Sequence, residues 1–232
     1  MPDVVLVLAD QPALVDAIEF TRAWAASPEP KAARASLLSG CFPHAIKPDS
    51  PSLEAELKAA GMGLVVSTQI VTPQLGDIVV VTSANPGRVR LSLLHPRLVS
   101  KSGEDDFLVS HVDVMPTLLG LSGLPIPAAV QGRDHSALLL DGRGARPESI
   151  YAEGNLGSPA EWRMIVRGLD RIVFDRNLKV THLYNLGVDP QEADNLASDP
   201  AAELKRAGLR ALLKDWVRRT EDRMDASGLK RR

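Results

Sequence analysis

The stretch VVLVLADQ, residues 4–11, begins with six apolar residues and ends with a carboxylic acid and an amide. A short, continuous run of Val and Leu is typical of a strand buried on both faces of a parallel sheet. Two more runs have the same character, at residues 63–67 and 77–82. We therefore expect three parallel strands that share one sheet.

Helical patterns alternate with these strands. We expect helices over residues 13–25, 34–38 and 52–60, where Gly40 and Gly61 end the second and third. A further helix is expected over 109–121, with a kink or a fresh start at Pro116. The alternation predicts an α/β fold: a mostly parallel sheet sandwiched by helices over residues 1–147. The Pro- and Gly-rich residues 123–147 would form a surface connection with a short helix at 136–140.

The pattern changes after Ser149. Short strands at 162–167, 171–175 and 182–185, separated by turn residues, predict a small antiparallel subdomain over residues 148–232. A terminal helix over 203–217 would pack on it. Its expected apolar stripe is Leu204, Leu212, Leu213 and Trp216.

Composition excludes several classes of protein. The chain has 232 residues, a formal net charge of −2 and one cysteine, Cys41. It therefore offers no intrachain disulfide and no cysteine zinc site, and its charge does not indicate nucleic acid or an anionic membrane surface as a partner. No secretory leader and no membrane-spanning run occurs in the sequence, so the expected location is cytoplasmic.

Polar residues at the strand ends are candidate metal ligands. Ligands bind beyond the carboxyl ends of strands in open α/β sheets. Asp10 and Gln11 follow the first strand, and Asn85 follows the third. Their oxygens suit a hard cation such as calcium. The alternative is that these residues only form turns or cap helices.

A second candidate site lies at the helix that contains Arg34. The free amides of a helix N-terminus attract anions, and a guanidinium adds a two-point contact. The alternative for Arg34 is a structural salt bridge. The five histidines show no metal-ligand spacing, so we expect them to be structural or exposed, and we expect Cys41 to be a packed side chain.

Six blocks, in order along the chain, resemble the sulfatase family of the alkaline phosphatase superfamily. They are PDVVLVLADQ (2–11), FTRAWAASPEPKAARASLLSGCFPH (20–44), PSLEAELKAAG (51–61), VVVTSAN (79–85), VSHVDVMPTLLGLSGLPIP (109–127) with QGRD (131–134), and LYNLGVDPQEADNLASDP (183–200). The resemblance implies Asp10, Gln11 and Asn85 as metal ligands, and Arg34 with Lys31 as anion-binding residues.

This chain departs from the family pattern at decisive positions. The family places Cys or Ser, converted to formylglycine, four residues before the arginine that Arg34 matches. Here that position is Pro30, which has no nucleophilic group, so no formylglycine is expected. The second metal turn normally has Asp where this chain has Ala84. A lysine- and histidine-containing segment expected after Gly61 is also absent.

Three interpretations remain open. The first, which we favour, is a sulfatase-like protein without standard catalysis that binds a sulfate or phosphate ester, another anion or a partner protein. Its calcium or magnesium site would be weak or absent. The second is an active, metal-dependent sulfate or phosphate ester hydrolase with a non-standard site. The third is a decayed or internally deleted product with a shortened sheet whose exposed edges favour a homo-oligomer.

Overall fold

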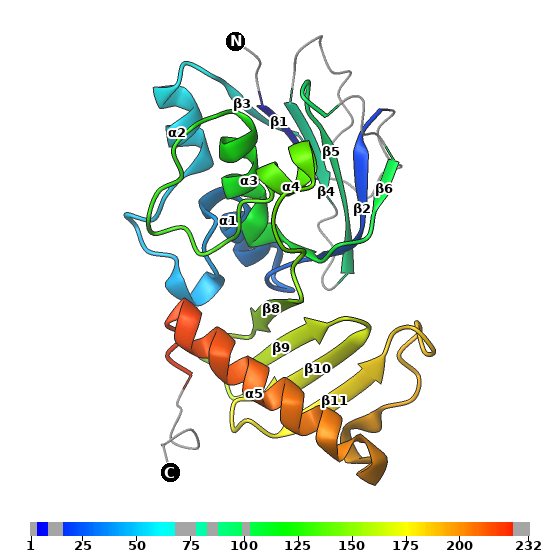
Figure 1. Ribbon diagram of the computed structural model, residues 1–232. Coiled ribbons are helices and arrows are strands. Elements are labelled where there is room, and N and C mark those ends of the chain that lie inside the picture. Colours follow the sequence, from blue (N-terminus) through cyan, green and yellow to red (C-terminus); the bar gives the residue numbers. More distant parts are fainter. Residues whose placement is uncertain (1–3, 9–15, 68–77, 83–87, 99–102, 225–232) are drawn as a thin grey trace. The chain divides into compact units, whose positions relative to one another are not determined.

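The computed structural model describes residues 4–8, 16–67, 78–82, 88–98 and 103–224. The chain divides into two compact units, Met1–Pro147 and Glu148–Arg232. Each unit is built around its own sheet (Figure 1), with seven strands in the first and four in the second.

The three strands predicted from the apolar runs form neighbouring members of the first sheet. They are β1 (Val4–Leu8), β3 (Leu64–Ser67) and β4 (Ile78–Thr82). Strand β1 lies between the other two and is parallel to both. Every residue of β4 is buried, which explains its unbroken apolar sequence.

The first sheet is mostly parallel, as predicted, but it also contains antiparallel pairings. Strand β5 (Arg88–Leu94) runs antiparallel to β4 and to β2 (Ile18–Trp24). Beyond β2 lie β6 (Gly103–Asp105) and β7 (Val109–Ser110), both parallel to it. The helix predicted over residues 13–25 is wrong within the described residues, because β2 occupies them. Its Ile, Phe, Thr and Trp side chains favour a strand, and partners on both sides supply its backbone hydrogen bonds.

Four helices accompany this sheet and lie on one side of it in Figure 1. They are α1 (Pro30–Ser39), α2 (Leu53–Ala59), α3 (Val114–Leu121) and α4 (Ser136–Asp141). Leu37 of α1, Leu53 and Leu57 of α2, and Met115 of α3 are at most 1% exposed. Burying one such side chain stabilises the fold by about 1.5–3 kcal/mol.

Two of the predicted helices have different boundaries. The helix expected over 109–121 is divided into β7, the 3-10 turn η3 (His111–Asp113) and α3. Pro116 is the third residue of α3, in the first turn, where a missing N–H costs no hydrogen bond. Helix α1 begins at Pro30, earlier than expected, because proline is favoured at the first position of a helix.

The second unit is an antiparallel meander with one long helix. Its strands are β8 (Ser149–Gly154), β9 (Trp162–Arg167), β10 (Asp170–Asp175) and β11 (Val180–Asn185), in spatial order of sequence. Strand β8 was not anticipated. Helix α5 (Glu203–Thr220) lies across the sheet (Figure 1).

The buried stripe of α5 is shifted from the predicted one. Leu204 is 89% exposed, so its placement in the stripe is wrong, while Leu209, Leu213, Trp216 and Val217 are buried. Leu204 is the second residue of the helix, and its side chain falls outside the face that meets the sheet. Trp216 packs in the core as predicted, and its indole N–H donates to Ser149 Oγ at 3.1 Å.

Candidate anion-binding site

Helix α1 places the predicted anion-binding residues on its solvent side. Ala33, Ser36 and Leu37 are buried, whereas Lys31 and Arg34 are exposed. This division follows the helical period, because residues that face the sheet recur every three or four positions. Lys31 and Arg34 are therefore accessible to a ligand.

The N-terminus of α1 has the features of an anion site. Glu29 is its N-cap residue, and no side chain makes a capping hydrogen bond there. Pro30 has no N–H, so Lys31 and Ala32 present the first amides of the helix. Arg34 lies four residues after Pro30, on the same face, and side chains of a helix lean toward its N-terminus. Arg34 and the first amides thus share one end of the helix.

No nucleophile stands at the first position of the helix. Pro30 is exposed and begins α1. The nearest hydroxyl along the chain, Ser27, is buried at 3% exposure and donates a short hydrogen bond to Glu29 Oε2. Because that hydroxyl is buried and hydrogen-bonded, Ser27 does not present it to solvent at the start of α1.

A buried histidine lies beneath this site, at the carboxyl end of β4. His111 Nε2 is 3.0 Å from Thr82 Oγ1, the last residue of β4. Burial lowers the pKa of His111 to about 4, and the nearby backbone of Ala33 in α1 only partly opposes this shift. His111 is thus neutral at pH 7 and connects β4 to α1.

The predicted metal ligands lie outside the described residues. Asp10 and Gln11 follow β1, and Ala84 and Asn85 follow β4. The two strands are paired in parallel register up to Leu8 and Thr82. Their carboxyl ends consequently lie side by side at one edge of the sheet.

Asp113 connects three segments of the first unit. Its Oδ2 accepts the backbone N–H of Ser110 at 2.8 Å, and its Oδ1 accepts that of Arg133 at 2.8 Å. His135 Nε2 lies 3.4 Å from Oδ2. Asp113 and His111 are on one turn and have different partners, so these contacts are structural and do not form a catalytic pair.

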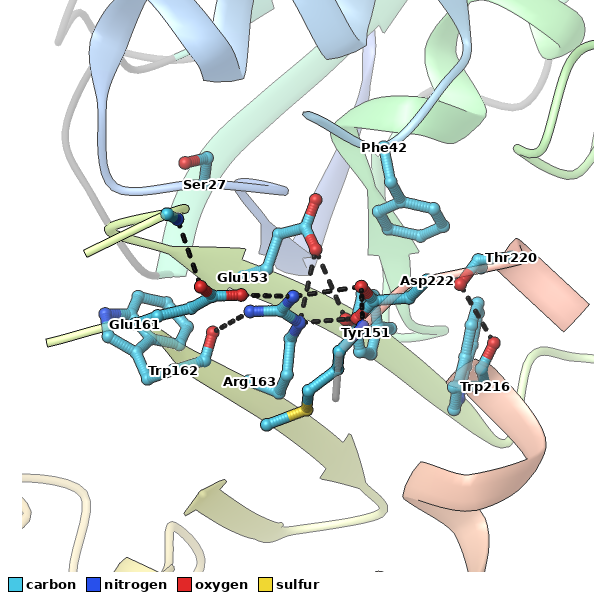
Figure 2. Close-up of polar contacts among 12 residues, drawn as sticks. Ser27, Phe42, Tyr151, Glu153, Glu161, Trp162, Arg163, Trp216, Thr220 and Asp222 are labelled. Atoms are coloured by element: carbon cyan, nitrogen blue, oxygen red, sulfur yellow. Dashed lines mark hydrogen bonds and ion pairs between the residues drawn. The ribbon is translucent and has the colours of Figure 1, made fainter. Parts of the chain in front are cut away.

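A second polar cluster, in the second unit, was missed by the sequence analysis. Arg163 of β9 is 1% exposed and meets three carboxylates (Figure 2). Its Nε and Nη2 lie 2.5 and 3.0 Å from Asp222, Nη2 lies 2.7 Å from Glu161, and Nε lies 3.4 Å from Glu153. Burial by itself would lower the pKa of Arg163, but the hydrogen bond to Asp222 and the surrounding negative charge together outweigh it and raise the pKa.

Tyr151 completes this cluster. Its hydroxyl donates to Asp222 Oδ2 at 2.6 Å, and burial followed by the charge of Glu153 raises its pKa well above the usual value. The cluster joins β8, β9 and the segment after α5. An arginine inside the apolar run of WRMIVR was the available sequence signal, because a buried cation requires paired carboxylates.

Comparison with known proteins identifies the family. The family model described as N-sulphoglucosamine sulphohydrolase, C-terminal, matches residues 84–219, more than half of the chain. The chain belongs to the sulfatase family. The resemblance seen in the sequence is confirmed.

Relatives of this sulfatase-family chain are known in sequence and structure. It is 33% identical over 119 residues to a Δ4,5-hexuronate-2-O-sulfatase of Bacteroides thetaiotaomicron, and that alignment covers 48% of this chain and 24% of the relative. A solved 2-O GAG sulfatase has a TM-score of 0.79 at 13% identity, covering 95% of this chain and 93% of that one.

A third relative was solved in complex with its substrate, D-glucosamine-2-N,6-O-disulfate. It has a TM-score of 0.55 at 18% identity and covers 63% of this chain and 35% of that one. The structural likenesses show the α/β sulfatase fold. No helix in the described ranges combines the length and apolar character needed to cross a bilayer.

Proposed function

We propose that this sulfatase-family protein binds a sulfate ester at the N-terminus of α1 and does not turn it over by the formylglycine mechanism. The observation that carries the proposal is that Pro30, which the family resemblance matches to the nucleophile position, is the exposed first residue of α1. A pyrrolidine ring has no group to oxidise and no atom to attack sulfur with. The buried hydroxyl of Ser27, held by Glu29, does not substitute for it.

The remaining groups still suit an oxyanion. Amides at the start of α1 and the positive end of the helix dipole attract negative charge. Arg34 supplies a planar, two-point donor and Lys31 a mobile cation, both exposed. These groups can bind and orient a sulfate or phosphate ester, but they provide no group for covalent catalysis.

The family resemblance implies a divalent cation, and this chain's donors suit one only weakly. Asp10, Gln11 and Asn85 would hold it; in the sequence they follow β1 and β4, whose carboxyl ends are paired. Calcium or magnesium needs about six oxygen ligands, several of them charged. This set contains one carboxylate, because Ala84 stands where the family has Asp. A bound cation would add positive charge beside the ester.

A sulfated sugar is the proposed ligand class. Two of the related proteins are a hexuronate-2-O-sulfatase and a protein whose substrate is a disulfated glucosamine. The chain matches only part of the first, so the ligand class is a proposal and not an assignment. Sulfate on a sugar ring carries the charge and geometry that Arg34 and Lys31 fit.

The test measures binding and turnover on one sample. Calorimetric titration with glucosamine-6-sulfate should show binding that weakens about tenfold or more in Arg34→Ala, because one charge-assisted contact is worth about 1.5–3 kcal/mol. Lys58→Ala, an exposed residue of α2, is the matched control and should bind unchanged. Aryl sulfate and aryl phosphate should not be hydrolysed with or without calcium, magnesium or manganese. Metal-dependent turnover lost in Asp10→Ala would overturn the proposal in favour of an active hydrolase.

A further inference from the structure

Helix α5 carries an excess of positive charge that the rest of the chain does not share. Among residues 203–220 there are six basic and two acidic side chains, a balance of four positive charges. The whole chain has a formal net charge of −2. The basic residues are therefore concentrated on one element.

Three of these cations form a stripe on the exposed face, which we call the α5 stripe: Arg210, Lys214 and Arg218. They are spaced four residues apart, so they follow each other along one face at steps of about 6 Å. Like charges at this spacing destabilise a helix by about 0.2–0.5 kcal/mol for each pair. The repulsion between these cations decreases when anions bind along the row.

Few carboxylates neutralise the stripe. Asp215 lies 3.0 Å from Arg218, but the two side chains are 56% and 79% exposed, and such a pair contributes little. Arg210 and Lys214 form no ion pair with any described residue. By contrast, Arg206, one turn earlier, is engaged by Glu203 and the carbonyl of Asp199.

A residue of strand β10 restrains part of the stripe. The guanidinium of Arg210 lies over the ring of Phe174, 5.9 Å from its centroid. Contact with an aromatic ring restricts the side chain without removing its donors from solvent. Ordering a cation before a ligand arrives reduces the entropy lost on binding.

We propose that the α5 stripe binds a sulfated polysaccharide strand, an inference that rests on the proposed recognition of sulfated sugars at α1. Sulfates repeated along a sugar chain match cations repeated along a helix, and guanidinium groups contact such oxyanions at two points. The exposed face of α5 has no aromatic residue, and single-stranded nucleic acid is bound by stacking its bases on aromatic side chains, so the stripe suits a sulfated sugar better. The stripe would hold a sulfated polymer on the second unit through contacts of its own.

The experiment measures the binding of heparin, desulfated heparin and a DNA duplex to the full chain at several salt concentrations. The test variant is Arg210→Gln/Lys214→Gln/Arg218→Gln, since glutamine has a helix propensity close to those of lysine and arginine. The matched control is Arg167→Gln/Arg176→Gln/Lys179→Gln, three exposed cations of the same unit that lie outside α5. Circular dichroism verifies that both variants fold.

We expect heparin binding that falls steeply with salt, weakens at least tenfold in the α5 variant and changes less than twofold in the control. Equal losses in both variants, equal binding of desulfated heparin, or DNA binding as tight as heparin binding would overturn the proposal. Glucosamine-6-sulfate titration separates it from the proposed function. If only the α1 proposal is wrong, the wild-type protein does not bind glucosamine-6-sulfate, but the α5 variant still binds heparin more weakly than wild type. If only the stripe proposal is wrong, the wild-type protein binds glucosamine-6-sulfate, and the α5 variant binds heparin as tightly as wild type.

Discussion

The guanidinium of Arg163 holds the carboxylate of Asp222 at two points, with Nε 2.5 Å from Oδ2 and Nη2 3.0 Å from Oδ1. The contact joins β9 to the segment that follows α5, 59 residues later in the chain. Because both side chains are 2% exposed, neither can turn to water when its partner is lost.

Asp222→Ala should therefore destabilise the protein by about 3 kcal/mol, since removing one partner leaves the other charge and the Tyr151 hydroxyl without their main contact. Urea unfolding followed by tryptophan fluorescence measures this. Arg167→Met, an exposed arginine at the end of the same strand, is the control and should change stability by less than 0.5 kcal/mol, the usual range for a surface change. Equal effects of the two substitutions would show that the cluster does not support the fold.

The edge strand β11 is completed by a side chain. Asn195 Oδ1 accepts the backbone N–H of Leu183 at 3.0 Å, and its Nδ2 donates to the carbonyl of Thr181 at 3.0 Å. Asn195→Ala should cost about 1–2 kcal/mol, the usual cost of losing a capping side chain. Asn195→Asp should cost less, because it keeps the acceptor and loses only the donor. Thermal unfolding that ranks alanine no worse than aspartate would contradict this account.

Two glycines should respond to alanine in opposite directions. A Cβ on Gly132 would lie 1.8 Å from the carbonyl oxygen of Val112, a backbone atom that cannot move aside alone. Gly132→Ala should destabilise by about 3 kcal/mol or more, as backbone and overpacking strain do. In α5 a Cβ on Gly208 would meet nothing within 4 Å. Gly208→Ala should stabilise by about 1 kcal/mol through helix propensity. The midpoints of urea unfolding of the two variants, compared with that of the wild type, test both predictions.

Acid should destabilise the first unit through buried histidine. The pKa of His111 is lowered by burial to about 4, from 6.5. Between pH 6.5 and 4, His111 is protonated in the unfolded chain but not in the native state. Its contribution to the free energy of unfolding is therefore fully present above pH 6.5 and is lost as the pH falls toward 4. The loss is at most about 3 kcal/mol. His95, lowered to about 4 by burial, acts in the same direction.

His111→Asn should flatten the fall in urea midpoint between pH 6.5 and 4.5, although its stability at pH 7 is lower because the Thr82 contact is lost. His182→Asn, at an exposed position, should retain the wild-type profile. A slope unchanged in His111→Asn would assign the acid sensitivity to other groups.

The sequence predicted the strands that consist of continuous apolar runs, including β3 at the sheet edge, where Val65 is 47% exposed. Strands β1, β3 and β4 share one sheet, and their continuous apolar runs identify them. Strand β2 was mistaken for a helix because its stability comes from β5, β6 and β7, which follow it by many residues. Leu204 was misplaced because an apolar residue in the first turn of a helix need not face the sheet.

The candidate site was predictable in part. Exposure of Lys31 and Arg34 follows from the helical period of residues 30–39, and Pro30 begins the helix as its N-terminal proline. The Arg163 cluster was not found, because its carboxylates come from Glu153, Glu161 and Asp222, and their approach to one guanidinium depends on the meander and on α5. The spacing of residues within a short segment does not predict contacts between segments that are far apart in the sequence.

The proposed metal site allows a last, quantitative prediction. With Asp10 as its only carboxylate, the site should bind calcium in the millimolar range, where 10 mM calcium would stabilise the fold by about 1.4 kcal/mol or less. Asp10→Asn should abolish that stabilisation, whereas Asp49→Asn, an exposed aspartate, should not. Ala84→Asp adds a second carboxylate and should increase the affinity for calcium at least tenfold. The shift of the unfolding temperature over a series of calcium concentrations measures this affinity. Stabilisation of the wild-type protein by micromolar calcium would contradict the prediction that a site with one carboxylate binds calcium weakly. It would also reopen the case for hydrolysis by a metal-bound water, because a tightly held cation could activate one without any nucleophile at position 30.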